Sequence, residues 1–162
     1  MVRKYEYSLI AAVPDNWVIG NGLKIPWYIP EDFKLFKERT LDSVVIMGKN
    51  TWDSLPDNVR PLPGRINIIL NNERIEIEGA VVCTSIDEAL SEAQEYGKEI
   101  FCMGGASIYR QMIDNATYLY ISHVKGEFEG DVFFPKFDVA DYDIVEEKKF
   151  EKFVFRKYKL IR

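Results

Sequence analysis

The chain has 162 residues, 47% of them hydrophobic and 29% charged, and its 21 Lys and Arg against 26 Asp and Glu leave a net charge of −5. This length and composition predict one globular domain over residues 1–162 with a sizeable core. The acidic balance, with no basic stripe, argues against a nucleic-acid partner. No apolar run approaches the roughly 20 residues of a membrane span, and the first residues lack the apolar stretch of a secretory signal. We therefore expect a cytoplasmic protein without membrane contact.

The cysteines and the single histidine offer no metal or nucleophile site. Cys83 and Cys102 lie far apart in strand-like apolar runs without a Cys-x-x-Cys pair, which favours buried free thiols over a disulfide or a metal site. His123 stands alone in a strand-like run, so neither a zinc site nor a Ser-His-Asp triad is expected. The sequence predicts no bound metal.

Strands and helices are expected to alternate along most of the chain. The predicted strands are residues 5–13, 43–47, 66–70, 80–83 and 100–103, and the predicted helices start at Pro30, after Gly48, at the capping box of Ser85 and Glu88, and after Gly105. The C-terminal segments 118–122, 142–149 and 153–160 are strand-like, with no helical pattern between them. This order predicts an α/β fold with a mostly parallel sheet covered on both sides, and an antiparallel addition at one edge.

The segment from Pro14 to Pro26 separates the first strand from the first helix. It is rich in Gly, Asn and Pro. Its length and glycine content predict a mobile functional loop rather than a tight connection.

Asp32 is a carboxylate with aromatic and aliphatic neighbours in the sequence. Helical spacing puts it on one stripe with Leu35, Phe36 and Arg39, so it is expected to face inward. A carboxylate in apolar surroundings either gains a hydrogen-bond partner or keeps its proton through a raised pKa, and both states serve an enzyme. The alternative is an acid in the first turn of a helix, favoured by the helix dipole.

Three other polar side chains are candidates for the same site. Trp27 is an N–H donor beside a proline, and Ser122 is a hydroxyl in an apolar strand, so both can serve Asp32. Arg65 follows a stiff Pro-Leu-Pro-Gly segment that can hold a guanidinium for a substrate carboxylate. The alternatives are a core tryptophan and a solvated arginine.

Two glycine turns, at Gly48-Lys49-Asn50-Thr51 and Gly104-Gly105-Ala106-Ser107, each lead from a strand into a helix. Free backbone N–H groups at such turns favour an anion, and two turns suggest a dinucleotide. Neither turn matches the phosphate loop of nucleoside triphosphatases or Gly-x-Gly-x-x-Gly. The alternative is that the glycines only permit tight turns.

Taken together and in order, these segments closely resemble the dihydrofolate reductase family. The matching stretches are Ser8–Ala12, Val18–Gly20, Pro26-Trp27 with Pro30–Asp32, Val45–Trp52, Arg60–Arg65, Asn67–Leu70, Gly104-Gly105 with Tyr109, and Glu129–Asp131. The resemblance implies a single-domain α/β fold, an eight-stranded, mainly parallel twisted sheet with an antiparallel C-terminal edge and about four flanking helices. It also implies a monomer.

The resemblance further implies an oxidoreductase that reduces 7,8-dihydrofolate to 5,6,7,8-tetrahydrofolate with NADPH. Tetrahydrofolate supplies one-carbon metabolism and thymidylate synthesis, and the family is a target of antifolates. Its nearest rival is a pyrimidine reductase of riboflavin synthesis, which shares the fold but is not expected to carry the Pro-Trp pair, Asp32 and Arg65 together. The rival from another class is a catalytically silent protein that binds folate or a nucleotide.

Within the resemblance, the catalytic residues are Asp32, Trp27 and Ser122. Asp32 matches the acid that holds the pterin, where a planar carboxylate accepts two parallel hydrogen bonds from a ring N–H and the exocyclic amine. The proton reaches N5 through the held substrate and a water, whose network Trp27 and Ser122 fix. Hydride comes from the nicotinamide to C6.

The resemblance also assigns the binding residues. Arg65 pairs with the glutamate α-carboxylate, the peptide bond between Gly104 and Gly105 is cis, and the loop from Pro14 to Pro26 is the lid over the nicotinamide. The substrate residues are Ile10, Ala11, Asp32, Phe36, Leu55, Leu62, Arg65 and Ser122. The cofactor residues are Ala12, Ile19, Gly48, Lys49, Asn50, Thr51, Leu70, Asn71, Asn72, Met103, Gly104, Gly105, Ala106, Ser107, Ile108 and Tyr109.

The chain departs from the family where the adenosine 2′-phosphate is expected. Lys49 stands where Arg is common, Ser107 where some members carry another Arg, and Asn71-Asn72 replaces a frequent Ser or Thr pair. Lys49 and Asn72 remain to bind that phosphate, with Arg74 as a further candidate.

Overall fold

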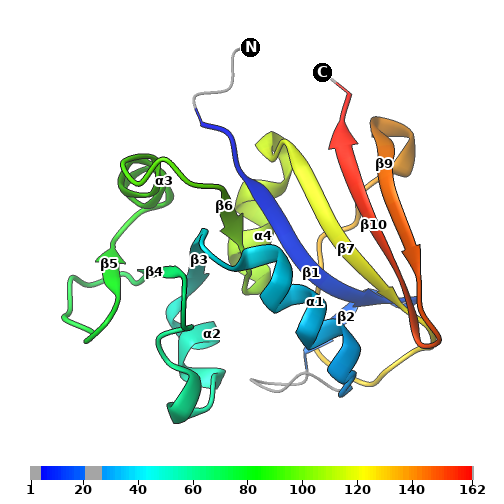
Figure 1. Cartoon of the computed structure of the whole chain (residues 1–162), viewed down its shortest axis with the longest axis horizontal. Helices are drawn as coiled ribbons and strands as arrows, with labels where there is room; N and C mark the ends of the chain where they lie inside the picture. The colour runs from blue at the N-terminus through cyan, green and yellow to red at the C-terminus, as the bar shows by residue number, and fades with distance from the viewer. Residues whose placement is uncertain (1–4, 21–26, 162) are drawn as a thin grey trace.

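An eight-stranded sheet forms the centre of the computed structural model, which describes residues 5–20 and 27–161 (Figure 1). The strand order is β5-β4-β3-β6-β1-β7-β10-β9. The bounds are Ser8–Pro14 (β1), Val44–Gly48 (β3), Ile66–Leu70 (β4), Val81–Cys83 (β5), Ile100–Cys102 (β6), Tyr118–Val124 (β7), Tyr142–Lys149 (β9) and Phe153–Leu160 (β10). The first six strands in this order, from β5 through β4, β3, β6 and β1 to β7, pair in parallel. Strand β10 is antiparallel to both β7 and β9. The predicted sheet and its antiparallel edge are confirmed.

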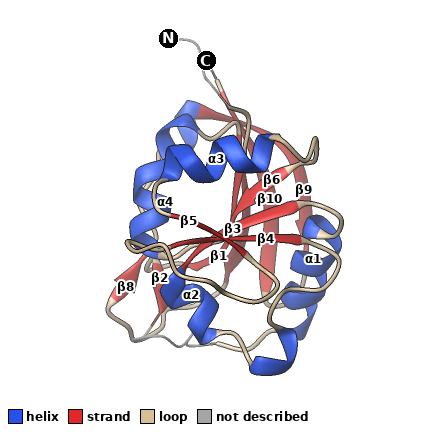
Figure 2. Ribbon diagram, turned by 90° about the vertical axis from the view of Figure 1, so that its left-hand side faces the viewer, coloured by secondary structure: helices blue, strands red, loops and turns tan. Residues whose placement is uncertain are grey.

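Four α-helices cover the two faces of this sheet (Figure 2). They are Pro30–Thr40 (α1), Lys49–Ser54 (α2), Ile86–Gln94 (α3) and Ala106–Met112 (α4), and three short 3-10 helices cover Asp57–Val59, Ile113–Asn115 and Val139–Asp141. Side chains of β3 alternate between the faces: Val44 and Ile46 pack with residues of α3 and α4, while Val45 and Met47 pack with residues of α1 and α2. The nearly continuous apolar runs are therefore buried on both sides, as in other parallel sheets.

The start of α1 places Asp32. Pro30 occupies a first-turn position, and the backbone N–H of Asp32 donates to the carbonyl oxygen of Ile29 at 3.0 Å. On the predicted stripe Leu35 is buried, and Asp32, Phe36 and Arg39 are half-buried. The inward orientation of this stripe is confirmed, and it carries the carboxylate toward the sheet.

The predicted loop between Pro14 and Pro26 contains a short strand that the sequence did not indicate. Val18–Gly20 (β2) pairs antiparallel with Val132–Phe133 (β8) as a separate two-stranded sheet. The side-chain amide of Asn16 also donates to the carbonyl oxygen of Phe128 at 2.9 Å. Strands this short have no readable periodicity, and their partners lie far along the chain. Residues 21–26 of the predicted lid are outside the described part.

The cysteines and the histidine lie within the packed strands of the sheet. Cys83 and Cys102 are buried free thiols, as predicted. His123 lies on β7, where its Nε2 is 2.7 Å from the hydroxyl of Tyr158. Burial, helped by the charge of Arg156, lowers the pKa of His123 to about 4, so the ring is neutral at physiological pH.

Over residues 5–20 and 27–161, every helix is too short or too polar to cross a lipid bilayer.

Candidate active site

A cavity of about 580 Å³ opens at the carboxyl ends of several strands of the sheet. Its walls come from the middle of β1, the end of β4, the turns after β3 and β6 with the helices α2 and α4 that follow them, the start of α1, and β2 and β8. This is the edge at which open α/β sheets bind their ligands. Among the described residues that line the cavity, the charged side chains are Asp32 and Lys49.

Most of the predicted site residues meet in this cavity. Those that line it are Ala11, Ala12, Ile19, Trp27, Asp32, Gly48, Lys49, Asn50, Thr51, Leu70, Asn71, Asn72, Met103, Gly105, Ala106, Ser107, Ile108 and Tyr109. They come from eight separate stretches of sequence, so the fold and not the local sequence brings them together.

The remaining predicted residues are not part of the cavity wall. The four apolar ones belong to the hydrophobic cluster that also contains Trp27 and Met103, and they are Ile10, Phe36, Leu55 and Leu62. Gly104 lies one residue before the lining residue Gly105. The contact of these side chains with a substrate stays a prediction.

The side chain of Asp32 accepts a hydrogen bond that bears on its chemistry. The hydroxyl of Ser122, on β7, donates to Oδ1 of Asp32 at 2.6 Å, and Ser122 is buried opposite Ala12 of β1. Burial raises the pKa of Asp32, and the bond from Ser122 partly opposes that rise. Trp27 shares the cavity with Asp32 while its ring packs on Phe128, with centroids 5.3 Å apart. The predicted link from Trp27 to Asp32 through water stays a prediction.

Ser122→Ala should raise the pKa of Asp32 further, because the hydrogen bond that stabilises the ionised carboxylate is removed. Carbon NMR titration of the labelled Asp32 carboxyl measures the shift directly. Ser122→Thr keeps a hydroxyl and is the matched control, so its pKa should stay near that of the wild type. An unchanged pKa in Ser122→Ala would show that the hydroxyl does not act on the carboxylate.

The two glycine turns lie against each other at the cavity. The backbone N–H of Gly48 donates to the carbonyl oxygen of Gly104 at 2.8 Å, and the bond between Gly104 and Gly105 is cis, as the resemblance implies. Gly104 has φ +113°, and a Cβ there would lie 3.2 Å from the ring of Tyr109. The hydroxyl of Tyr109 in turn donates to the carbonyl oxygen of Ile10 at 2.7 Å. Gly104 and the ring of Tyr109 therefore pack closely in this wall.

The cavity wall around α2 suits the phosphates of a dinucleotide. It combines Lys49 with neutral hydrogen-bonding side chains, which are Asn50, Thr51, Asn71, Asn72 and Ser107. A Cβ on Gly105 would lie 3.4 Å from Thr51 Oγ1, so the second glycine turn lies close to the start of α2. These residues fit the predicted cofactor.

Arg74 is placed differently from the sequence interpretation. Its Nη2 donates to both carboxylate oxygens of Glu88, at 3.0 and 2.7 Å, and Arg74 does not line the cavity. The guanidinium of Arg74, which was a candidate for binding the 2′-phosphate, is therefore paired with Glu88.

Arg65 is held in place by its neighbours. Nε donates to the carbonyl oxygen of Pro63 at 2.9 Å, and Nη1 donates to Oγ1 of Thr40 at 3.1 Å. The guanidinium also lies over the ring of Phe36, 5.9 Å from its centroid. The stiff segment thus orients the side chain, as expected, although Arg65 lies outside the cavity lining.

Four lining residues were missed by the sequence interpretation: Gly20, Phe33, Ser54 and Val132. Ser54 lies one helical turn after Thr51 on α2, so helical spacing could have found it. Phe33 follows Asp32, and its ring packs on Tyr28 with centroids 5.5 Å apart. Gly20 and Val132 enter through the pairing of β2 with β8, which no local pattern indicates.

Comparison with known proteins agrees with this geometry. The family model described as dihydrofolate reductase matches residues 6–160. Dihydrofolate reductase of Buchnera aphidicola from Acyrthosiphon pisum is 44% identical over 135 residues, which cover 83% of this chain and 82% of that protein. Dihydrofolate reductase of Neisseria meningitidis strain Z2491 is 46% identical over 134 residues, 82% of this chain and 81% of that protein.

The fold is matched by a solved structure. Dihydrofolate reductase from Enterococcus faecalis, complexed with NADP(H) and RAB-propyl, superposes with a TM-score of 0.86 at 29% identity, covering 99% of this chain and 98% of that one. The family model spans nearly the whole chain, and the relatives share more than 40% of the aligned residues. The chain belongs to the dihydrofolate reductase family.

Proposed function

We propose that the cavity binds dihydrofolate with its pterin on Asp32 and binds NADPH along the two glycine turns. The reaction is the NADPH-dependent reduction of 7,8-dihydrofolate to 5,6,7,8-tetrahydrofolate, and the chain is an oxidoreductase. The observation that supports the proposal is that Asp32, whose pKa is raised by burial, lines the same cavity as both glycine turns. A half-buried acid and a binding surface for a dinucleotide in one cavity are what this reaction needs.

Asp32 anchors and orients the pterin in this proposal. One of its oxygens already accepts a hydrogen bond from Ser122, and a planar carboxylate has acceptor sites left for a ring N–H and an exocyclic amine. N5 of the substrate gains a proton as C6 takes hydride. Asp32 is the acid of the cavity wall, so it organises the arrival of that proton through water, with Trp27 and Ser122 fixing the solvent. NADPH supplies the hydride when bound.

The other predicted residues hold the two ligands. Ala12, Ile19, Met103 and Tyr109 line the nicotinamide side, and the glycine turns flank the pyrophosphate. Lys49 and Asn72 bind the 2′-phosphate through charge and hydrogen bonding. Support comes from their common presence in the cavity wall.

Arg65→Leu should raise the Michaelis constant for dihydrofolate about 10- to 100-fold, because a charge-assisted hydrogen bond to the glutamate tail is lost. The constant for a pterin without that tail should hardly change. Steady-state kinetics with both substrates checks the split. Equal effects on the two would mean that Arg65 serves the structure through Thr40 and Pro63.

We also propose a single-domain monomer that works in the cytoplasm without nucleic acid. One sheet running through residues 8–160 supports the single domain, and the net charge of −5 argues against a nucleic-acid partner. A solution mass of two chains by light scattering would contradict the monomer.

Loss of NADPH absorbance on adding dihydrofolate to the purified protein tests the function. Steady turnover is expected. Tight binding of both ligands without turnover would support the silent-binder alternative instead.

A further inference from the structure

Among the described residues that line the cavity, Lys49 carries the positive charge. NADPH differs from NADH by a 2′-phosphate that is doubly charged near neutral pH. The polar neighbours Asn50, Asn71, Asn72 and Ser107 are neutral, so they can bind a ribose hydroxyl as well as a phosphate. Discrimination between the two coenzymes therefore depends on the ammonium group of Lys49.

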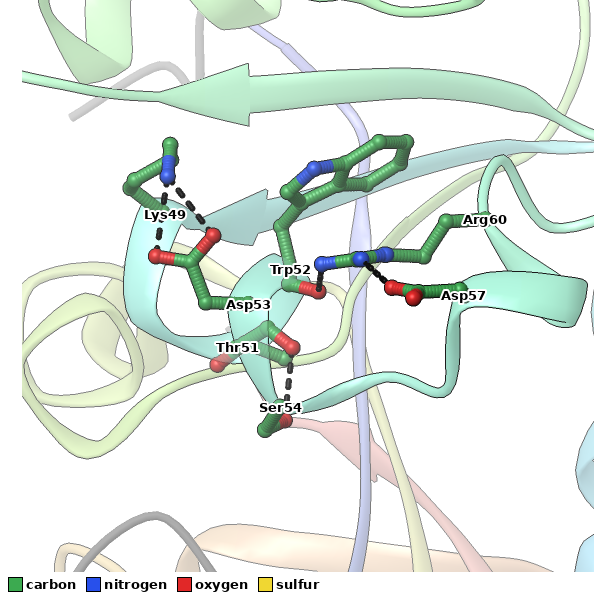
Figure 3. A network of polar contacts seen from close by, with 7 residues as sticks. All are labelled: Lys49, Thr51, Trp52, Asp53, Ser54, Asp57 and Arg60. Atoms are coloured by element: carbon green, nitrogen blue, oxygen red, sulfur yellow. Dashed lines mark hydrogen bonds and ion pairs between the residues drawn. The ribbon is translucent and has the colours of Figure 1, made fainter.

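That ammonium group already has an anionic partner. Lys49 Nζ donates to Oδ1 and Oδ2 of Asp53 at 2.6 and 2.8 Å, one turn further along α2 (Figure 3). The side chains are 32% and 42% exposed, so solvent weakens the pair without removing it. Asp53 does not itself line the cavity. It reaches a ligand only through Lys49 and through its charge.

We propose that Asp53 is a positioning residue that limits the preference for NADPH over NADH by competing with the 2′-phosphate for Lys49. The inference rests on the proposed function. A phosphate that binds Lys49 must share the ammonium protons with the carboxylate and must lie close to a like charge. NADH has no 2′-phosphate and therefore neither shares the ammonium protons with Asp53 nor is repelled by its charge. Asp53 thus weakens the binding of NADPH but not that of NADH.

The test measures dissociation constants of NADPH and NADH by calorimetry for the wild type and Asp53→Asn. Removing the carboxylate charge should tighten NADPH binding about threefold, in the range of exposed ion pairs, and leave NADH within error. The gain should shrink at high salt, because the groups are solvent-exposed. Turnover is not needed for this readout.

Asp57→Asn is the matched control. Asp57, in the neighbouring 3-10 helix, forms an ion pair with Arg60 instead of Lys49 and lies outside the cavity lining (Figure 3). Asp57→Asn makes the same change in net charge as Asp53→Asn. The ratio of the dissociation constants of NADPH and NADH should stay that of the wild type. In a Lys49→Gln background the preference for NADPH should fall, and Asp53→Asn should then have no further selective effect.

Three outcomes overturn the inference alone, provided that the wild type binds and turns over NADPH. They are an unchanged ratio in Asp53→Asn, weaker NADPH binding, which would mean that Asp53 orients Lys49 for the phosphate, and an equal gain in Asp57→Asn. A wild type that binds neither coenzyme overturns the proposed function as well.

Discussion

Asp32→Asn should lower turnover at neutral pH by about 10²- to 10⁴-fold, the usual contribution of a positioned acid or base. The amide cannot accept both hydrogen bonds from the pterin, and it does not organise a proton for N5. Turnover should recover partly in acid, where solvent can protonate the substrate. The dependence of kcat on pH, compared with that of the wild type, measures both effects.

Glu31→Gln is the matched control for this change. Glu31 is the neighbouring acid in the first turn of α1, but it is exposed and does not line the cavity. Its replacement should leave kcat and its pH profile unchanged. A wild-type rate in Asp32→Asn at neutral pH would remove Asp32 from the mechanism.

The same substitution should increase the stability of the fold at neutral pH. Because burial raises the pKa of Asp32 in the folded state, the folded chain binds the proton more tightly than the unfolded one. The stability from that proton is fully present below the unfolded pKa and is lost as pH rises through the folded pKa. Asn carries no such charge, so the free energy of unfolding of the variant should exceed that of the wild type at pH 7 in urea titrations. A lower value would contradict a buried-charge cost.

Gly130→Val should slow hydride transfer about 10- to 100-fold, the cost of misplacing a wall by about an ångström. A Cβ at Gly130 would lie 2.2 Å from the carbonyl oxygen of Gly20 and 2.5 Å from Cγ1 of Val18. The first of these atoms belongs to backbone, so either β2 or the segment of Gly130 must shift, and a shift of β2 moves the cavity residues Ile19 and Gly20. Overpacking of this kind costs about 1–3 kcal/mol. Single-turnover kinetics in a stopped-flow instrument measures the step.

Gly97→Ala separates this effect from a general loss of stability. Gly97 has φ +65°, so alanine is strained there, but a Cβ meets nothing within 4 Å, and the residue does not line the cavity. This variant should lose stability and keep the wild-type hydride-transfer rate. If Gly130→Val also kept that rate, the pairing of β2 with β8 would not position the cavity wall.

The parts of the fold that the sequence predicted correctly have strong local signals. The runs that became β1 and β3 are apolar enough to be buried on both faces, and Ser85 caps α3 by accepting the backbone N–H of Glu88 at 3.0 Å. The stripe on α1 brought Asp32 inward. These features depend on neighbours within a few residues, so one sequence is enough to read them.

The parts that could not be predicted depend on contacts between distant segments. Val132 enters the cavity through β8, a two-residue strand whose partner lies far along the chain. The engagement of Arg74 with Glu88 arises because the segment before β5 folds onto the start of α3. Similarly, the sequence placed Lys49 at the cofactor but could not show that Asp53 holds it.

Transfer of deuterium from NADPH labelled at the transferring position of the nicotinamide tests the central claim most directly. The protein is mixed with labelled NADPH and 7,8-dihydrofolate, and the product is analysed by NMR. We expect tetrahydrofolate with deuterium at C6. Oxidation of the coenzyme without label at C6, or no product while both ligands bind, would contradict the assignment of this cavity to hydride transfer.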